Sequence, residues 1–543
     1  MRKAGPASLG VLLAIALGAC GPAEPRLDQT ADSAATSPAV SAIERGAEER
    51  PPAGAQLTPT AARAQLPTAT PTAGPLPGAT PTWPPDDLPL SRDGPWLLGL
   101  GADEVLALNP DGTGLTHLNL NGGLDLEADI ATGGSEVGAW QAFRTHEQLL
   151  LGPNFLLRIF RLPNTEPTFT IPMLFDALAV RAGYPWESGE RSTNPDLLAV
   201  ARSPLLWSPN GRYLAFIGAI DGPSADVYAF DTVSKAVLRL TDGPNRAVLM
   251  GWSPDSRWVV HMEATFEHGE DGPEYEPVAV WAADVQGGPA TYLYASRGGL
   301  GDSEEIVGWG SGSEFVVAER DALGRTGRLA QVDAQTGAFK VLYAGEVSSA
   351  AVDPANGTLA FVPYDPSFFP LGEEPPAAPA PAWAGAEGTV SEGGIYLLRR
   401  GRDVPERLEY EEWYSAYESM QWIPELERFF SAWFLTVSFT AEGEVDRVFP
   451  EREVPIASPD GRWLVFRRLG PSPDIAVYTA DGDPFYEVTG LNISDVVWKR
   501  DSSGFYLFSA EAGLRFFSTS SRSDSVVHPA PGFAGESLRL VYP

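Results

Sequence analysis

A short pattern of residues recurs along this chain and constrains its fold more than any other feature. Residues 207–216 read WSPNGRYLAF, residues 252–260 read WSPDSRWVV, and residues 457–466 read ASPDGRWLVF. Two weaker copies occupy residues 352–361 and 498–508. Successive copies or equivalent anchors mostly lie about 40 to 57 residues apart, a length that suits one small antiparallel sheet per repeat.

Each copy predicts an inner strand, a tight turn and a second strand. The turn forms because Pro fixes φ, Asp accepts hydrogen bonds from nearby backbone amides, and Gly accepts a positive φ. The strand after the turn, such as residues 213–216, is apolar on both faces, which indicates burial between two neighbouring sheets. The residues to which we assign a structural role at these anchors and turns are Trp207, Pro209, Gly211, Trp252, Pro254, Asp255, Pro459, Asp460, Gly461 and Trp498.

From about residue 95 onward, short apolar runs alternate with turns rich in Gly, Pro, Asp and Asn. This texture predicts an all-β protein of many short strands. Helical periodicity is scarce, and the best exception, around residues 172–201, predicts a short helix within an insertion.

The repeats resemble the TolB-like Pro-Asp propeller repeats, relatives of the WD repeats, across roughly residues 95–543. The resemblance implies a single large β-propeller of four-stranded blades. Counting the anchors favours eight blades and permits seven to nine, with the units near residues 129 and 422 the weakest. Residues 96–112 look like the middle of a blade without its inner strand, and residues 537–542 form an orphan strand. We predict that the C-terminal strand pairs with the N-terminal hairpin and closes the ring.

The N-terminus is typical of an export signal. Arg2 and Lys3 precede an apolar run, residues 9–17, which is shorter than the roughly 20 residues that span a bilayer. Residues 17–20 read LGAC, which resembles the lipobox of bacterial lipoproteins. The resemblance implies that residues 1–19 are removed as a signal peptide and that a diacylglycerol is attached to Cys20. The alternative is an ordinary secretory signal with an incidental cysteine.

This prediction places the protein outside the cytoplasm, held by acyl chains on the outer face of the cell membrane or on an outer membrane. Residues 20–92 are rich in Pro, Ala and Thr and poor in aromatic side chains, so we predict a disordered tether. Residues 93–543 form the predicted propeller domain. Cys20 is the only cysteine, so once it carries lipid the domain has no thiol for a disulfide.

The composition excludes some partners. The formal net charge of −33 argues against nucleic acid, whose binding depends on Lys and Arg, and against a polybasic hold on anionic lipid. The acyl chains on Cys20 are therefore the predicted membrane contact, and the expected partners are unidentified envelope proteins or a glycan.

The sequence nominates no catalytic residue, no metal ligand and no cofactor. A serine peptidase domain of the kind that follows some propellers needs a Gly-x-Ser-x-Gly motif, and the chain contains none. His261 and His268 flank two glutamates, which is conceivable as a metal site. We favour a solvated acidic hairpin loop as the explanation of this segment.

One insertion suits a contact with a partner. Residues 363–383 interrupt a blade between two strands and combine aromatic side chains with Pro and Glu. The aromatic residues that form the candidate binding loop are Tyr364, Phe368, Phe369 and Trp383. Local packing of a long loop is the alternative explanation. We therefore predict a protein-binding or scaffolding module at the cell envelope without enzymatic activity; the alternative is a carbohydrate- or metal-binding sensor or enzyme that uses the channel mouth.

Overall fold

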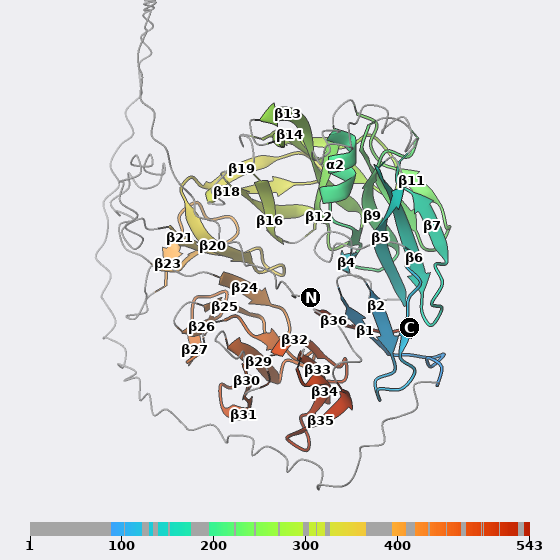
Figure 1. The fold of residues 1–543 in the computed structure, drawn as a ribbon. Coiled ribbons are helices and arrows are strands. Elements are labelled where there is room, and N and C mark those ends of the chain that lie inside the picture. Colours follow the sequence, from blue (N-terminus) through green and yellow to red (C-terminus); the bar gives the residue numbers. More distant parts are fainter. Residues whose placement is uncertain are drawn as a thin grey trace, which may run out of the picture. The chain divides into compact units, whose positions relative to one another are not determined.

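The computed structural model shows an all-β protein with nine antiparallel blades arranged in a ring (Figure 1). Nine is the upper end of the predicted range and one more than the eight blades that the anchors favoured. The structure describes residues 88–543 apart from 102–103, 122–129, 134–138, 150–151, 175–194, 222–223, 244–245, 270–271, 297–302, 311, 321–325, 365–393, 409–418, 433–434, 452, 469–473, 490, 492, 510 and 530–536.

The first three blades contain the least regular strands. Blade 1 combines β36 (Ser537–Val541), β1 (Trp96–Leu100), β2 (Val105–Leu108) and β3 (Thr116–His117). Blade 2 contains β5 (Trp140–Leu149), β6 (Gly152–Arg161) and β7 (Phe169–Pro172), and an isolated bridge from Ile130 to Phe143 stands where its inner strand belongs. Blade 3 contains β8 (Leu206–Trp207), β9 (Tyr213–Gly218), β10 (Asp226–Asp231) and β11 (Val237–Arg239), and β4 (Thr132–Gly133) pairs with β8 in parallel.

The next three blades have four strands each. Blade 4 contains β12 (Arg246–Trp252), β13 (Trp258–Gly269), β14 (Gly272–Asp284) and β15 (Thr291–Ala295). Blade 5 contains β16 (Ser303–Trp309), β17 (Glu314–Arg320), β18 (Thr326–Asp333) and β19 (Phe339–Tyr343). Blade 6 contains β20 (Val347–Val352), β21 (Leu359–Pro363), β22 (Tyr396–Leu398) and β23 (Glu406–Arg407).

The last three blades repeat the same order. Blade 7 contains β24 (Ser419–Ile423), β25 (Arg428–Ala432), β26 (Thr436–Phe439) and β27 (Val445–Phe449). Blade 8 contains β28 (Ile456–Ala457), β29 (Trp463–Arg468), β30 (Asp474–Thr479) and β31 (Pro484–Val488). Blade 9 contains β32 (Ile493–Trp498), β33 (Gly504–Ser509), β34 (Gly513–Ser518) and β35 (Ser523–His528).

The C-terminal strand closes the ring, as predicted. β36 is the inner strand of blade 1 and pairs antiparallel with β1, from Trp96 opposite Val541 to Leu100 opposite Ser537. The first blade is thus built from both ends of the domain, so no inner strand is left with an open edge at the junction.

The apolar core lies between the blades, and every pair of neighbouring blades shares a buried cluster. Leu540 of blade 1 packs with Phe508 of blade 9, and Val465 of blade 8 packs with Phe505 of blade 9. This two-sided burial explains why strands such as β9 are apolar throughout: all six of its residues are buried.

The connections between the strands lie on two faces of the propeller. Because the strands of a blade alternate in direction, the turns after the first and third strands share one face, which we call the turn face. Between paired strands on it, the connections have at most seven residues, the length of 109–115, 162–168 and 399–405. Residues 131–139, between the bridge at Ile130 and β5, form a longer connection of nine. The connections after the second and fourth strands share the other face, which we call the insertion face. It carries residues 173–205 and residues 364–395, the two longest connections between strands.

The helix expected near residues 172–201 is present as α2 (Pro195–Arg202), in the connection from blade 2 to blade 3. Within the described part of the chain, no helix is long and apolar enough to cross a bilayer.

Candidate functional site

The anchor tryptophans connect neighbouring inner strands. Trp252 donates from Nε1 to the carbonyl oxygen of Leu206 at 2.9 Å, and Trp498 donates in the same way to Ile456 at 3.2 Å. Trp207 is buried at the equivalent place in blade 3. The structure therefore places these three residues inside the propeller wall, away from any open surface.

The repeat turns lie on the turn face, where they hold the chain reversal. Asp460 Oδ1 accepts hydrogen bonds from Ser458 Oγ at 2.7 Å and from the N–H of Arg462 at 3.1 Å. Gly211 and Gly461 have φ of 66° and 68°, a region that favours glycine. The remaining turn residues, Pro209, Pro254, Asp255 and Pro459, occupy the same turns of blades 3, 4 and 8.

Serine replaces glycine in two of these turns. The contacts that these serines make were not predicted from the sequence. Ser256 and Ser502 have φ of 61° and 56° and are buried. Ser256 Oγ accepts the N–H of Asn210 at 3.0 Å, and Ser502 Oγ accepts the N–H of Asp460 at 3.1 Å. Each hydroxyl thus ties its turn to the turn of the preceding blade.

The predicted binding loop belongs to the insertion face, because it joins β21 to β22. Tyr364 lies at its start, half-buried, and donates its backbone N–H to the carbonyl of Glu346 at 2.9 Å. Phe368, Phe369 and Trp383 lie outside the described residues, as does Cys20.

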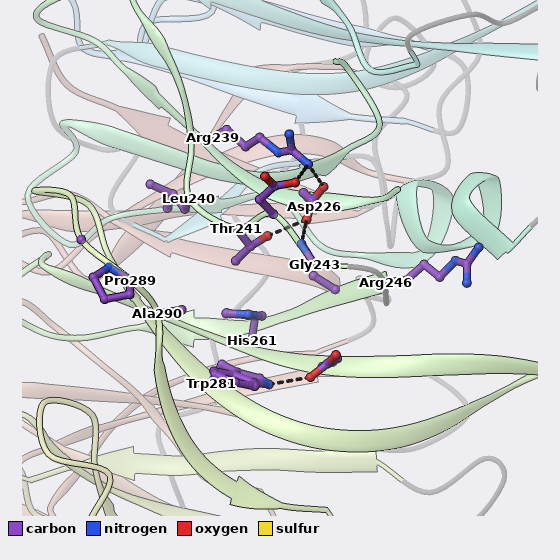
Figure 2. A pocket seen from close by; sticks show the side chains of 14 residues that line it. Asp226, Arg239, Leu240, Thr241, Gly243, Arg246, His261, Trp281, Pro289 and Ala290 are labelled. Carbon is purple, nitrogen blue, oxygen red and sulfur yellow. Dashed lines mark hydrogen bonds and ion pairs between the residues drawn. The ribbon is translucent and has the colours of Figure 1, made fainter. Parts of the chain in front are cut away.

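A groove of about 500 Å³ lies between blades 3 and 4 (Figure 2). Cross-strand register builds its blade-4 wall, in which one lateral row runs through Leu249, His261, Trp281 and Tyr292. Two residues further along β13, on the same side of the sheet, Glu263 lies between Ala247 and Ala279. Because the two alanines are small, space remains beside His261 and Trp281. The indole Nε1 of Trp281 donates to Glu263 Oε2 at 2.8 Å.

Blade 3 supplies the opposite wall through β11 and the connection that follows it. The buried carboxylate of Asp226 accepts hydrogen bonds from Thr241 Oγ1 at 3.0 Å and from the N–H of Gly243 at 3.3 Å. It also pairs with Arg239 at 2.7 Å, and Figure 2 shows these contacts together. They fix the backbone so that Leu240 and Thr241 line the groove.

The insertion that carries α2 meets the groove at Arg246. Asp196, in the first turn of α2, accepts a hydrogen bond from Arg246 Nε at 3.0 Å. The other end of the helix is held from blade 2, because the buried guanidinium of Arg144 donates to the carbonyl oxygens of Val200, Ala201 and Ser203.

The position of His261 differs from the one predicted from the sequence. We expected a solvated acidic hairpin loop, and β13 and β14 do pair antiparallel as far as Gly269 and Gly272, but His261 lies within β13 and is 4% exposed. Its Nδ1 is buried and has no hydrogen-bond partner. Burial lowers the pKa of His261 to about 4, so the ring is neutral at pH 7.

This burial predicts an acid sensitivity that can be assigned to one side chain. Because the pKa in the folded state is about 4 and lies below its ordinary 6.5, the unfolded state binds more protons as the pH falls from 6.5 to 4. The wild type should lose about 3 kcal/mol of stability over this interval that His261→Leu does not lose. Urea unfolding at pH 7, 5.5 and 4 measures the difference.

The nearby Asp226 and Glu263 carboxylates stay in both proteins, so their contribution cancels in the comparison. Parallel stability curves for the wild type and His261→Leu would show that the imidazole is not held neutral by burial.

A second cavity, of about 740 Å³, lies between β24 and β28, the inner strands of blades 7 and 8. Its charged side chains Glu453 and Arg467 face each other at 3.6 Å. Among the described residues, no three His, Cys, Asp or Glu side chains gather as a metal site would require. The alternative of a metal or glycan at the channel mouth stays a prediction.

A local sequence match connects the chain to a bacterial protein. It is 34% identical over 105 residues to the uncharacterized peptidase YuxL of Bacillus subtilis (strain 168), and the match covers 18% of this chain and 14% of that protein. The chain thus spans a small part of that relative, whose activity is not transferred by the match. No family model matches the chain.

Solved structures match the chain at low similarity. A crystal structure of the eukaryotic initiation factor covers 75% of this chain and 89% of its own, with a TM-score of 0.44 and 12% identity. An oligogalacturonate lyase in complex with manganese covers 60% of this chain and 76% of its own, with a TM-score of 0.31 and 15% identity. The assignment rests on the strand topology of the chain itself: the protein is a β-propeller of four-stranded blades.

Proposed function

We propose that the protein is a lipid-anchored binding or scaffolding module that holds a protein partner on the insertion face of its propeller. The observation that supports this proposal is the difference between the two faces. No connection on the turn face is longer than the nine residues 131–139, whereas residues 173–205 and 364–395 connect strand ends on the insertion face. Long connections on a rigid scaffold are where binding residues usually stand.

The anchor in this proposal is the acylated thiol of Cys20, with residues 20–92 as a tether that lets the propeller stand outside the membrane. Each buried methylene of an acyl chain contributes about 0.8 kcal/mol, so two or three chains hold the protein firmly. The strong negative charge of the chain supports lipid, and not a basic surface, as the attachment.

The anchor is tested by Cys20→Ser expressed in a bacterium. The wild type should sediment with membranes and incorporate radiolabelled palmitate, and the variant should do neither. A Cys20→Ser protein that still sediments with membranes after a carbonate wash would contradict the lipid anchor.

Partner binding is tested on the insertion face with a matched control. The triple variant Phe368→Ala, Phe369→Ala, Trp383→Ala removes apolar surface from the candidate binding loop. The control, Val233→Ala with Val404→Ala, removes the two most exposed apolar side chains of the described residues, 71% and 61% exposed, both on the turn face.

We expect cross-linking and affinity purification from envelopes to recover a partner at least tenfold less with the triple variant, and within twofold of wild type with the control. Equal recovery with the wild type and the triple variant would move the contact away from this loop, and equal loss in both variants would indicate non-specific adhesion.

A further inference from the structure

The groove between blades 3 and 4 plays no part in the proposed function, since it is lined by strand residues and short connections. Its volume of about 500 Å³ falls within the range of about 300 to 1,000 Å³ that is typical of small-molecule sites. It opens to solvent, because Asp242, Gly288 and Pro289 on its rim are exposed.

Two buried nitrogen atoms of the groove lining make no hydrogen bond, Nδ1 of His261 and Nε of Arg239. His261 is 96% buried, yet Nδ1 makes no hydrogen bond, and leaving a buried polar atom unpaired costs about 1 to 3 kcal/mol. Figure 2 shows His261 between Trp281 and the Leu240–Thr241 segment, on the cavity side of β13. A ligand that offers a hydroxyl can pair with Nδ1 in either tautomer, because a hydroxyl both donates and accepts.

The charges around the groove disfavour an anion. Arg239 pairs with Asp226 and Asp242, both at 2.7 Å, and Arg246 pairs with Asp196 at 3.0 Å. Glu263 adds one more carboxylate to the lining. The acidic groups therefore outnumber the basic ones, and both arginines already have carboxylate partners.

The rest of the lining is apolar and includes an aromatic ring. Leu240, Ala247, Pro289 and Ala290 contribute apolar surface, and Trp281 is half-buried on the groove wall. An indole face beside a few hydrogen-bonding groups matches the C–H face and the hydroxyls of a sugar ring.

We propose that the groove between blades 3 and 4 binds a neutral carbohydrate, with a sugar ring against Trp281 and a hydroxyl hydrogen-bonded to Nδ1 of His261. Glu263, oriented by the indole N–H of Trp281, accepts a second hydroxyl. None of the groove-lining residues belongs to the long connections 173–205 and 364–395, so this proposal can be tested independently of the proposed protein partner.

The test uses the soluble Cys20→Ser chain and three classes of probe: the neutral trisaccharides maltotriose, cellotriose, mannotriose and chitotriose; the anionic trigalacturonate; and the cationic trilysine. Saturation-transfer NMR finds binders and calorimetry measures Kd. At least one neutral trisaccharide should bind with a Kd below about 1 mM, and trigalacturonate should bind at least tenfold more weakly. Binding of none of the neutral trisaccharides at 10 mM overturns the proposal.

Variants place the binding in the groove. His261→Leu removes the ring nitrogen and Ala247→Leu fills the space beside Trp281; each should weaken neutral trisaccharide binding at least tenfold, which corresponds to about 1.4 kcal/mol. The control Val341→Ala removes a 41% exposed apolar side chain of β19 in blade 5, outside the groove lining, and neutral trisaccharide binding should stay within twofold of the wild type. Unchanged Kd in both groove variants overturns the proposal.

Glu263→Gln separates a sugar from a cationic peptide segment. The glutamine oxygen can still accept from Trp281 and from a hydroxyl, so neutral trisaccharide binding should fall less than fivefold. Preferential binding of trilysine, lost in Glu263→Gln and in 0.5 M salt, would show that the groove takes a cationic chain and would overturn the carbohydrate assignment. Thermal unfolding of every variant confirms that the propeller is folded at the temperature of the measurement.

Discussion

Removal of residues 534–543 is expected to eliminate the cooperative unfolding transition of the propeller at 25 °C or to leave it with a small fraction of its stability. The deletion takes away β36, which is the inner strand of blade 1. Leu538, Leu540 and Val541 are at most 5% exposed, and the burial of each such side chain contributes about 1.5 to 3 kcal/mol. The sum is comparable with the 5 to 15 kcal/mol that stabilises a typical domain.

The loss of stability should exceed the contribution of the deleted side chains, because the deletion also exposes the residues that β36 covers. Without β36, β1 presents an unpaired edge from Trp96 to Leu100, and the apolar cluster that Phe508 of blade 9 shares with blade 1 loses Leu538 and Leu540. Exposed edges of this kind promote aggregation. Urea unfolding followed by tryptophan fluorescence measures the stability, and light scattering measures the aggregation.

Two controls make the result specific. Deletion of Pro543 alone should leave the free energy of unfolding within about 0.5 kcal/mol of the wild type, as expected for an exposed terminal residue. A synthetic peptide of residues 534–543 added to the truncated protein should restore the transition in proportion to its concentration. A truncated protein as stable as the wild type would show that the ring does not depend on this closure.

The closure was predictable because its signals are local. The N-terminal end of the domain has a β-hairpin without an inner strand, and the C-terminal end has a strand without a hairpin. Pairing the two completes one blade. The number of blades was harder to predict from the sequence, because two blades lack the repeat signature. Blade 2 has a single bridge at Ile130 in place of an inner strand, and blade 7 turns through Pro424 with Glu427 at φ of 52°, whereas blades 3 and 8 have Gly at positive φ in this turn.

The groove could not be predicted from the sequence. His261, Trp281 and Tyr292 come together only through the register of β13, β14 and β15, including a shift in register beside Trp281. The space beside them depends on Ala247 and Ala279, and alanines in strands carry no signal of a cavity. The sequence drew attention to His261 for its neighbours Glu263, Glu267 and His268, whereas its burial depends on residues of other strands.

Arg144→Met is expected to lower the free energy of unfolding by about 3 to 5 kcal/mol, because three carbonyl groups lose a buried hydrogen-bond donor and each buried unsatisfied group costs about 1 to 3 kcal/mol. Arg144 is fully buried, and its guanidinium donates to three carbonyl groups at the C-terminal end of α2. These carbonyls have no partner within the helix, and a positive charge beside them also complements the helix dipole. Methionine fills similar volume but donates no hydrogen bond, so the carbonyls lose a partner that they cannot replace from water while buried.

A matched control stands on the neighbouring strand. Arg161 is exposed and its guanidinium lies 5.5 Å from the ring of Trp140, so Arg161→Met should cost about 1 kcal/mol or less. Urea unfolding of both variants and the wild type at pH 7 gives the comparison. A similar small loss in both would show that the helix end does not need the guanidinium.

Amide hydrogen exchange shows whether the loss of stability in Arg144→Met begins in α2. α2 carries Asp196, whose carboxylate pairs with Arg246 on the rim of the groove. In Arg144→Met the amides of α2 should exchange at least tenfold faster than in the wild type, while those of β25 and β29, in blades 7 and 8 on the far side of the ring, keep their relative protection. Unchanged exchange in α2 would mean that the Asp196–Arg246 pair and the buried Leu197 and Val200 hold the helix without Arg144.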